Sequence, residues 1–199
     1  LDRLTTKAAD VGVASLKADI RLAGDFINVA IDGSVDGLRV DRITPDLIGR
    51  AELGVKARMV GDDITLSSLL LQSKALNISA EGSANLAADR TDLSYTIAAD
   101  NLGPFANAYD VNAAGAIKAS GAVSDALSVP RLIGEAAFSE LEFDDEPLGK
   151  VQVIHNATFG EAPEGHLNLS ADGSRFGPIT FDGGFLLANE TLDLTEMVA

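Results

Sequence analysis

The residues best suited to chemistry in this chain are its two histidines and its clustered carboxylates. His155 and His166 flank a short stretch at 160–163, and Asp62-Asp63 and Asp144-Asp145-Glu146 form two acidic clusters. Histidine transfers protons and binds metals near neutral pH, and carboxylates are calcium ligands. Neither cluster has the spaced oxygen ligands of an EF-hand loop, so we expect both to solvate turns. The histidines are expected to lie in exposed turns rather than to act as ligands.

Motifs of the common enzyme classes are absent from the sequence. There is no Gly-x-Ser-x-Gly, no His-Glu-x-x-His and no glycine-rich phosphate or dinucleotide loop. Cysteine is also absent, which excludes disulfides, thiolate metal sites and a cysteine nucleophile. We therefore expect no enzymatic activity, no metal site and no cofactor.

Composition narrows the class of protein further. The 199 residues carry a formal charge of −15, which argues against nucleic acid as a partner because its phosphates need a basic face. Hydrophobic residues make up 46% of the chain, too many for a disordered acidic tail, and aromatics only 5%, so aliphatic side chains must do most of the packing. The chain opens Leu1-Asp2-Arg3 without an initiator Met, and we interpret it as a segment of a longer protein.

The elements that must position any site are strands. Apolar and polar residues alternate with period two, the pattern of strands with one apolar and one polar face. Short turn signals separate these runs, including 61–63, 88–90, 143–145, 182–184 and 188–190, and they favour antiparallel hairpins. Helix signals are limited to one turn near 104–109 and a weaker one at 4–9. The sequence thus predicts an all-β chain, with alternating runs at 27–35, 51–59, 76–86, 93–99, 111–123, 148–154, 167–171 and 179–187.

Three short segments recur in the same order and predict an internal duplication, at approximately 27–110 and 111–199. Gly33-Ser34-Val35 matches Gly121-Ala122-Val123, and a Pro-x-Leu-Ile-Gly phrase occurs at 45–49 and again at 130–134. The run at 76–83 matches the run at 167–174. Because proline cannot donate to a strand ladder, each proline is expected at a strand start or edge, in a kink that leads into the next strand. Such repetition predicts one sheet that grows along a single axis.

On these motifs the chain resembles the TamB and AsmA-like family of large bacterial envelope proteins. The resemblance is carried by the glycine–valine and Pro-x-Leu-Ile-Gly phrases at 121–134 and by the run at 92–105, and it extends over most of the chain. It implies a tall, curved antiparallel sheet with an apolar concave face (a β-taco), in a periplasmic protein anchored in the bacterial inner membrane. It also implies action with TamA, an outer-membrane Omp85-type partner, in phospholipid passage between membranes or in assembly of outer-membrane proteins.

The apolar strand faces must meet another sheet, close into a barrel or line a cavity. Alternation alone favours a closed sandwich core, whereas the repeats and the family resemblance favour an open, elongated groove that holds phospholipid acyl chains. A chaperone or scaffold that pairs its edge strands with a client, and a passive stalk, are the alternative functions. The candidate groove residues are Leu53, Val55, Met59, Leu66, Leu76, Ile78, Leu86, Ile97, Ile117, Phe143, Leu167, Leu169, Ile179, Phe181 and Phe185.

Overall fold

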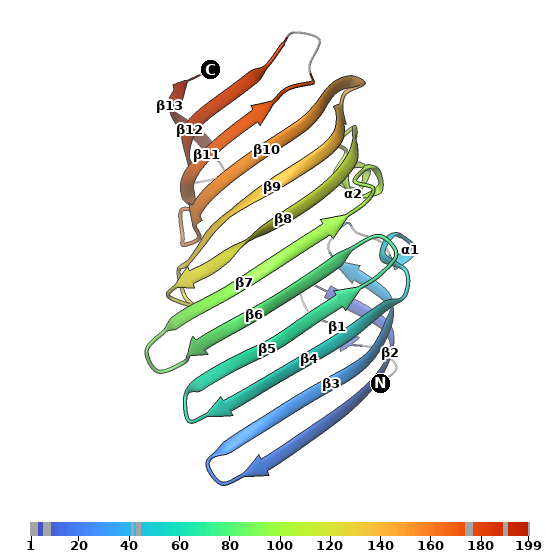
Figure 1. Cartoon of the computed structure of the whole chain (residues 1–199), viewed down its shortest axis with the longest axis vertical. Helices are drawn as coiled ribbons and strands as arrows, with labels where there is room; N and C mark the ends of the chain where they lie inside the picture. Colours follow the sequence, from blue (N-terminus) through green and yellow to red (C-terminus); the bar gives the residue numbers. More distant parts are fainter. Residues whose placement is uncertain are drawn as a thin grey trace.

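The computed structural model describes residues 4–5, 9–40, 42, 45–173, 177–188 and 191–198, and these form one antiparallel sheet of 13 strands. Strand order in the sheet follows strand order in the chain, so every strand pairs with its sequence neighbours (Figure 1). The strands are β1 (Leu4–Thr5), β2 (Ala9–Ala23), β3 (Phe26–Val40), β4 (Ala51–Val60), β5 (Asp63–Gln72), β6 (Asn77–Asn85), β7 (Arg90–Ala99), β8 (Ala113–Asp125), β9 (Pro130–Phe143), β10 (Glu146–Thr158), β11 (Glu164–Ala171), β12 (Ile179–Ala188) and β13 (Thr191–Val198). The prediction of an all-β, elongated antiparallel sheet is confirmed.

The meander arises because most connections are too short to cross the sheet. Only two residues separate β2 from β3, β4 from β5, and β9 from β10, and such links join antiparallel neighbours. In the β9–β10 link both Asp144 and Asp145 have positive φ angles, 48° and 63°. A two-residue link of this kind matches the right-handed twist of the strands, which confirms the turn predicted at 143–145.

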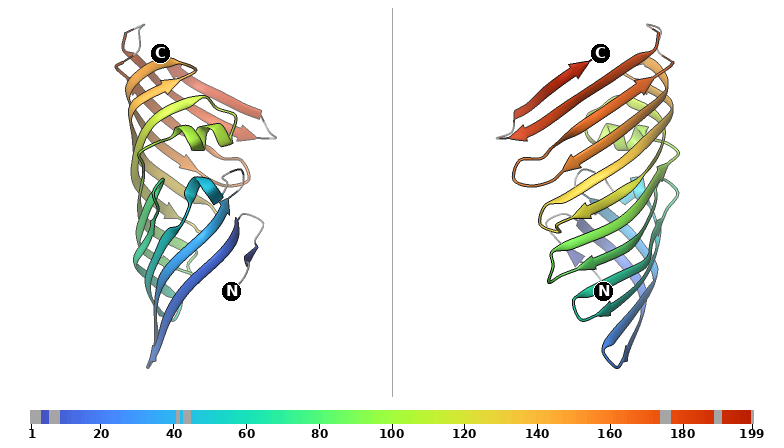
Figure 2. Two further views of the ribbon diagram at one scale, coloured as in Figure 1. Left: turned by 90° about the vertical axis from the view of Figure 1, so that its right-hand side faces the viewer. Right: turned by 60° about the vertical axis from the view of Figure 1, so that its left-hand side comes forward.

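The sheet is curved, and its two ends bend toward the same side. In the turned views the middle strands form a wall, whereas β2 and β3 at one end and β12 and β13 at the other lie on the same side of it (Figure 2). Two short helices, α1 (Pro45–Ile48) and α2 (Gly103–Ala108), lie on that side too. They connect β3 to β4 and β7 to β8, and thus sit at the same edge of the sheet.

The helix prediction at 104–109 is confirmed by α2. Pro104 stands in the first turn of α2, where its missing N–H is not needed, and the Tyr109 N–H donates to the Ala106 carbonyl at 2.9 Å to close the last turn. The weaker helix prediction at 4–9 is wrong for its described residues, because residues 4–5 are strand β1 and residue 9 begins β2. Residues 6–8 lie outside the described residues.

The two Pro-x-Leu-Ile-Gly phrases adopt different structures. Pro130 starts β9, as expected, but Pro45 opens helix α1, so the expectation of a strand start there is wrong. The other anchors fall five strands apart, on β3 and β8 and on β6 and β11. In an antiparallel meander, strands an odd number apart run in opposite directions, so these anchors are not related by a simple shift along the sheet. The duplication stays a prediction.

Two further differences from the sequence prediction lie inside strands. The turn predicted at 182–184 is wrong, because these residues lie within β12, where both glycines pair with β11 and Gly184 also pairs with β13. Strand β5 was not among the predicted runs. Its register shifts between Lys56 and Ala57 on β4, which leaves Ser67 without a directly opposed partner and breaks the alternation on which the prediction depended.

Candidate functional site

One face of the sheet carries most of its large apolar side chains. Directly paired residues on neighbouring strands point to the same face, so the register assigns every strand residue to one face or the other. We call the face that contains Val55 and Ile97 the apolar face, and the opposite side the outer face. A first row of paired residues on the apolar face runs unbroken from β2 to β12: Leu16, Gly33, Leu53, Leu71, Ile78, Ile97, Ala119, Ala136, Val153, Leu169 and Phe181.

Two parallel rows widen this strip. The second row contains Ala18, Ile31, Val55, Leu69, Ala80, Tyr95, Gly121, Gly134, His155, Leu167 and Gly183. The third contains Ile20, Val29, Ala57, Leu66, Gly82, Leu93, Val123, Leu132, Ala157, Gly165, Phe185 and Leu194. Tyr95 and His155 are the only polar side chains in the three rows. The strip is therefore continuous across the sheet.

No second layer covers the apolar face among the described residues. The extensive contacts between elements all join neighbouring strands, except for those of α1 with β3 and of α2 with β8. Within the described ranges no large side chain is fully buried. The accessible surface is 12,680 Å², whereas a compact monomer of this mass exposes about 8,900 Å². The closed sandwich favoured by alternation alone is therefore wrong for this chain.

Three of the buried residues lie where helix α1 covers one end of the apolar face. Ile48 of α1, Val35 of β3 and Ala51 of β4 are all buried, and Val35 and Ala51 are directly paired. Because α1 contacts β3, this helix covers the end of the strip at these two strands. The apolar face thus lies on the side toward which the sheet bends and where the helices sit (Figure 2).

The predicted groove residues fall together on the apolar face. Leu53, Val55, Met59, Leu66, Ile78, Ile97, Ile117, Leu167, Leu169, Ile179, Phe181 and Phe185 all lie on it, by direct pairing or by alternation. Phe143 ends β9 beyond register shifts on both sides, so pairing does not assign its face. Leu76 and Leu86 lie just outside β6, in the turns before and after it. Most of the set is half-buried, but Leu86 and Phe143 expose about half of their surface, at 49% and 48%. Their role in a lipid groove stays a prediction.

Sequence reasoning missed part of this face. Leu69 and Leu71 were overlooked because the bulge at Ser67 breaks the alternation of β5, and Leu132 and Phe138 because β9 was expected only as a kinked strand start. The run 69–71 of three leucines was the available signal, since a run bounded by turn residues is typical of a buried strand.

The prediction for the histidines is wrong, because both belong to strands rather than to exposed turns. His155 lies within β10 on the apolar face, half-buried, and its Nε2 is 3.0 Å from the Tyr95 hydroxyl. His166 lies in β11 on the outer face, where its Nε2 is 2.5 Å from the Asp182 carboxylate. Burial lowers the pKa of His155 and raises the pKa of Tyr95, which favours the neutral form of each side chain.

Glycines make the Tyr95–His155 contact sterically feasible. Tyr95, Gly121, Gly134 and His155 are successive members of the second row on β7 to β10. A Cβ atom would lie 2.7 Å from the Tyr95 hydroxyl if placed on Gly121 and 3.0 Å if placed on Gly134. The phenol therefore reaches over two strands that have no side chain at this level, and the two polar groups of the strip satisfy each other.

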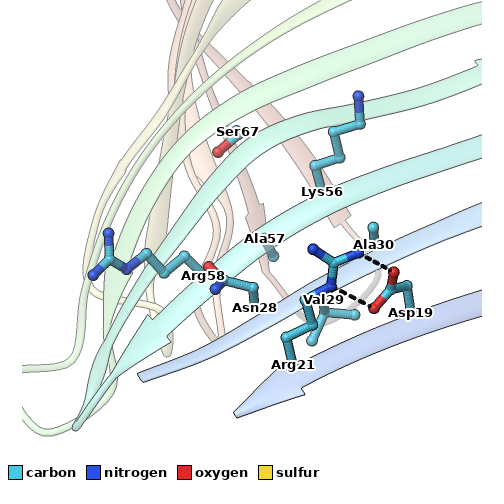
Figure 3. Close-up of a pocket in the computed structure, with 9 residues that line it drawn as sticks. All are labelled: Asp19, Arg21, Asn28, Val29, Ala30, Lys56, Ala57, Arg58 and Ser67. Carbon is cyan, nitrogen blue, oxygen red and sulfur yellow. Dashed lines mark hydrogen bonds and ion pairs between the residues drawn. The ribbon is translucent and has the colours of Figure 1, made fainter. Parts of the chain in front are cut away.

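The outer face is polar and carries local ion pairs. Figure 3 shows one hollow on it, where Arg21 forms two hydrogen bonds with Asp19, at 2.7 and 3.0 Å. The hydrogen bond from Arg21 lowers the pKa of Asp19. Farther along the sheet, hydrogen bonds from Asn168 and His166 lower the pKa of Asp182. These groups are solvent-exposed, so they keep the outer face charged in water without forming an enclosed site.

The described part of the chain contains neither a metal-binding cluster nor a membrane-spanning helix. There, no group of three or more His, Cys, Asp or Glu side chains is placed to hold a metal ion. Neither described helix has the length and apolar character required to cross a bilayer. No protein-family model, curated protein or solved structure matches the chain. The geometry of the apolar face is therefore the main guide to function.

Proposed function

We propose that the apolar face shields phospholipid acyl chains and conducts them across an aqueous gap. In this proposal the chain is a non-enzymatic, periplasmic segment of a TamB-like protein anchored in the inner membrane, and the lipid passes between the inner and outer membranes. The observation that carries the proposal is the first row, which is apolar on every strand from β2 to β12 and which no second layer of described residues covers.

The transfer free energy of an acyl chain and the length of the first row both favour a path over a single pocket. Each methylene removed from water is worth about 0.8 kcal/mol, so an acyl chain cannot cross water unshielded. Strands lie about 4.8 Å apart, so the first row is roughly 48 Å long, against roughly 15 Å for half the hydrocarbon core of a bilayer. The row is thus long enough for a tail to occupy successive positions. Its small and aliphatic side chains provide similar weak contacts at each step.

The resemblance to TamB and AsmA-like proteins supports the same proposal from the sequence. It adds a TamA-like outer-membrane Omp85 partner, engaged through the longer protein. The net charge of −15 fits this arrangement, because a charged outer face keeps an exposed apolar strip soluble.

Photo-crosslinking tests which face meets lipid. Ile78 and Leu169 lie on the apolar face, and their sequence neighbours Asn77 and Asn168 lie on the outer face, so each pair is a matched comparison. A photo-reactive residue at 78 or 169 should capture phospholipid from vesicles of phosphatidylethanolamine and phosphatidylglycerol, and one at 77 or 168 should not. Equal capture from both faces, or capture from the outer face alone, would contradict the proposal.

Lipid transfer tests whether the strip must be continuous. The purified protein should accelerate transfer of a fluorescent phospholipid from donor to acceptor vesicles. Ile97→Thr places a hydroxyl in the middle of the first row with little change in shape and should slow this transfer. Thr96→Ser, on the outer face of the same strand, is the control. An unfolding midpoint measured for each variant separates a blocked path from a lost fold. Unchanged transfer by a folded Ile97→Thr variant would count against a path along this row.

One observation favours a scaffold function as a second candidate. Described pairing of β1 with β2 covers only Asp10 and Val11, so the rest of the outer edge of β2 has no described partner strand. Unpaired edges accept strands from other chains. Photo-reactive residues at Lys17 of β2 and at Lys56 of β4 compare this edge with the sheet interior. Capture of an unfolded outer-membrane protein at 17 only would favour strand pairing, and no capture at either position would disfavour it.

A further inference from the structure

A hollow of about 720 Å³ lies between the two short helices at one edge of the sheet. We call it the rim hollow. It lies among α1, the β5–β6 turn and α2, and its size is that of a small-molecule site. Its polar groups include Arg42, Lys74 and Asn101, and its apolar lining includes Ile48, Pro104 and Ala108. It combines cations with apolar surface, the two features that an amphiphile with an anionic head requires.

Lys74 is presented to the rim hollow by a rigid turn. The Ser73 hydroxyl accepts hydrogen bonds from the backbone N–H groups of Ala75 and Leu76, at 3.3 and 3.0 Å, and donates to the Leu76 carbonyl at 3.0 Å. The Ser73 N–H also donates to that carbonyl at 2.9 Å. Among the described residues no carboxylate forms an ion pair with Lys74. Its ammonium is therefore available to a ligand.

Arg42 and Asn101 supply further donors. One guanidinium nitrogen of Arg42 donates to the Asp110 carboxylate at 3.0 Å, and this pair links the chain before α1 to the chain after α2. The remaining guanidinium N–H groups are not used by that bond. Asn101 accepts the Gly103 N–H through Oδ1 at 3.0 Å, which leaves its amide NH₂ as a donor. Donors around an apolar hollow suit a phosphate, which has only acceptor oxygens when ionised.

The distribution of charge along the sheet favours anion binding at the rim hollow over anion binding near the β13 end. Residues 1–90 contain 11 basic and 13 acidic residues, whereas residues 91–199 contain 4 basic and 17 acidic residues. Because strand order follows the sequence, the sheet is close to neutral at its β2 end and strongly negative at its β13 end. Both cations that line the rim hollow, Arg42 and Lys74, come from the near-neutral part.

The rim hollow adjoins the apolar face through α1. Ile48 lines the hollow and is itself buried, and α1 covers the end of the strip at Val35 and Ala51. We propose that the rim hollow binds the phosphate of a phosphodiester headgroup while the attached acyl chains lie on the apolar face. This inference rests on the proposed function and adds the headgroup class to it. The same donors suit a free phosphate ion, so the test must separate the two sources.

Binding of short-chain phosphatidylglycerol to the full chain, followed by NMR titration, tests the site. Lys74→Gln should weaken binding about tenfold, the effect of losing one charge-assisted hydrogen bond. Lys118→Gln removes an exposed lysine on the outer face of β8 and is the matched control, expected to bind as the parent does. Arg42→Gln should also weaken binding, and a thermal midpoint for each variant confirms that it is folded. Unchanged affinity in the Lys74→Gln and Arg42→Gln variants would overturn the site.

Two further ligands distinguish a lipid headgroup from free phosphate. They also distinguish failure of the rim hollow from failure of the lipid path. Inorganic phosphate should bind far more weakly than the lipid. The affinity for diacylglycerol of the same chain length should be the same in the parent and in the Lys74→Gln variant. If inorganic phosphate binds as tightly as the lipid, the headgroup assignment is overturned in favour of a phosphate site. If lipid is captured at Ile78 and Leu169 but the cation variants have no effect, the rim hollow fails and the lipid path stands. If lipid is captured at neither position and bound by neither parent nor variant, both fail.

Discussion

The Tyr95 hydroxyl and Nε2 of His155 are 3.0 Å apart, although the residues are 60 positions apart in the sequence and three strands apart in the sheet. Three strand spacings amount to about 14 Å, so the two side chains must lie nearly flat along the sheet to meet. They form a polar bridge across β7 to β10 within an otherwise apolar strip. This bridge spans four strands at the level where the intervening residues are glycines.

Removing the Tyr95 hydroxyl should destabilise the fold without disturbing its packing. Tyr95→Phe leaves the ring in place and deprives Nε2 of His155 of its partner, which should lower the free energy of unfolding by about 1 kcal/mol. Chemical denaturation measures this. Tyr95→Phe in a His155→Leu background is the comparison, because the partner of the hydroxyl is then absent. An equal loss in the two backgrounds would show that the bridge contributes nothing.

Stability should fall as the pH drops below the ordinary pKa of histidine. Burial lowers the pKa of His155 in the folded state, so the unfolded chain binds more protons below about pH 6.5 and acid favours unfolding. The stability contributed by neutral His155 is therefore complete above pH 6.5 and is lost as the pH falls through the lowered folded pKa. Denaturation curves between pH 7.5 and 5.5 should show this loss, and His155→Gln should reduce it. His166→Gln, on the outer face, should retain it.

Gly121 and Gly134, the two glycines between Tyr95 and His155, form what we call the glycine platform. Adding one methyl group to it should destabilise the fold. In Gly121→Ala the new Cβ would collide with the Ile133 carbonyl oxygen and lie 2.7 Å from the Tyr95 hydroxyl, so strands must move apart. Such overpacking costs about 1–3 kcal/mol. Gly54→Ala, in β4 on the outer face, meets only atoms at 3.8 and 3.9 Å and should be close to neutral. Equal stabilities of the two variants would refute the platform.

The β9–β10 turn should be improved by glycine. Asp145 adopts a φ of 63°, a conformation that costs side-chain-bearing residues energy and glycine almost none. Asp145→Gly should therefore raise the free energy of unfolding by about 0.5–1 kcal/mol. Glu142→Gly, three residues earlier within β9, should lower it by a similar amount because glycine weakens a strand interior. Chemical denaturation of both variants should give changes of opposite sign in the free energy of unfolding. Changes of the same sign would contradict the prediction.

The predicted groove set shows how far alternation can be trusted. Ile78, Ile97 and Leu169 were assigned to one face from period two alone, and the register pairs them across the sheet as expected. Alternation fails where backbone geometry shifts it, at the Ser67 bulge in β5. The turn signal at 182–184 fails for another reason, because its glycines are strand residues of β12. The strand-start expectation fails at Pro45, since proline suits the first turn of a helix as well as a strand start. The local pattern predicted most of the strands, but it did not predict the register shifts at bulges.

The candidate site divides in the same way. The apolar strip follows from the alternating pattern, because each strand carries its own apolar side wherever it lies. The Tyr95–His155 bridge and the rim hollow depend on pairings between distant strands, so no single stretch of sequence contains their signal. His155 was mistaken for an exposed turn residue because nothing near it in the sequence indicates the tyrosine it meets.

The sequence by itself determined that this chain is a series of one-sided strands joined by short antiparallel links, because residue period and turn chemistry act over a few positions. Only the tertiary structure decided that the apolar sides form one uncovered strip instead of the core of a sandwich. Both arrangements satisfy the same alternation. The choice depends on the twist and bending of the whole sheet, on whether its two ends meet, and on which residues oppose one another across strands.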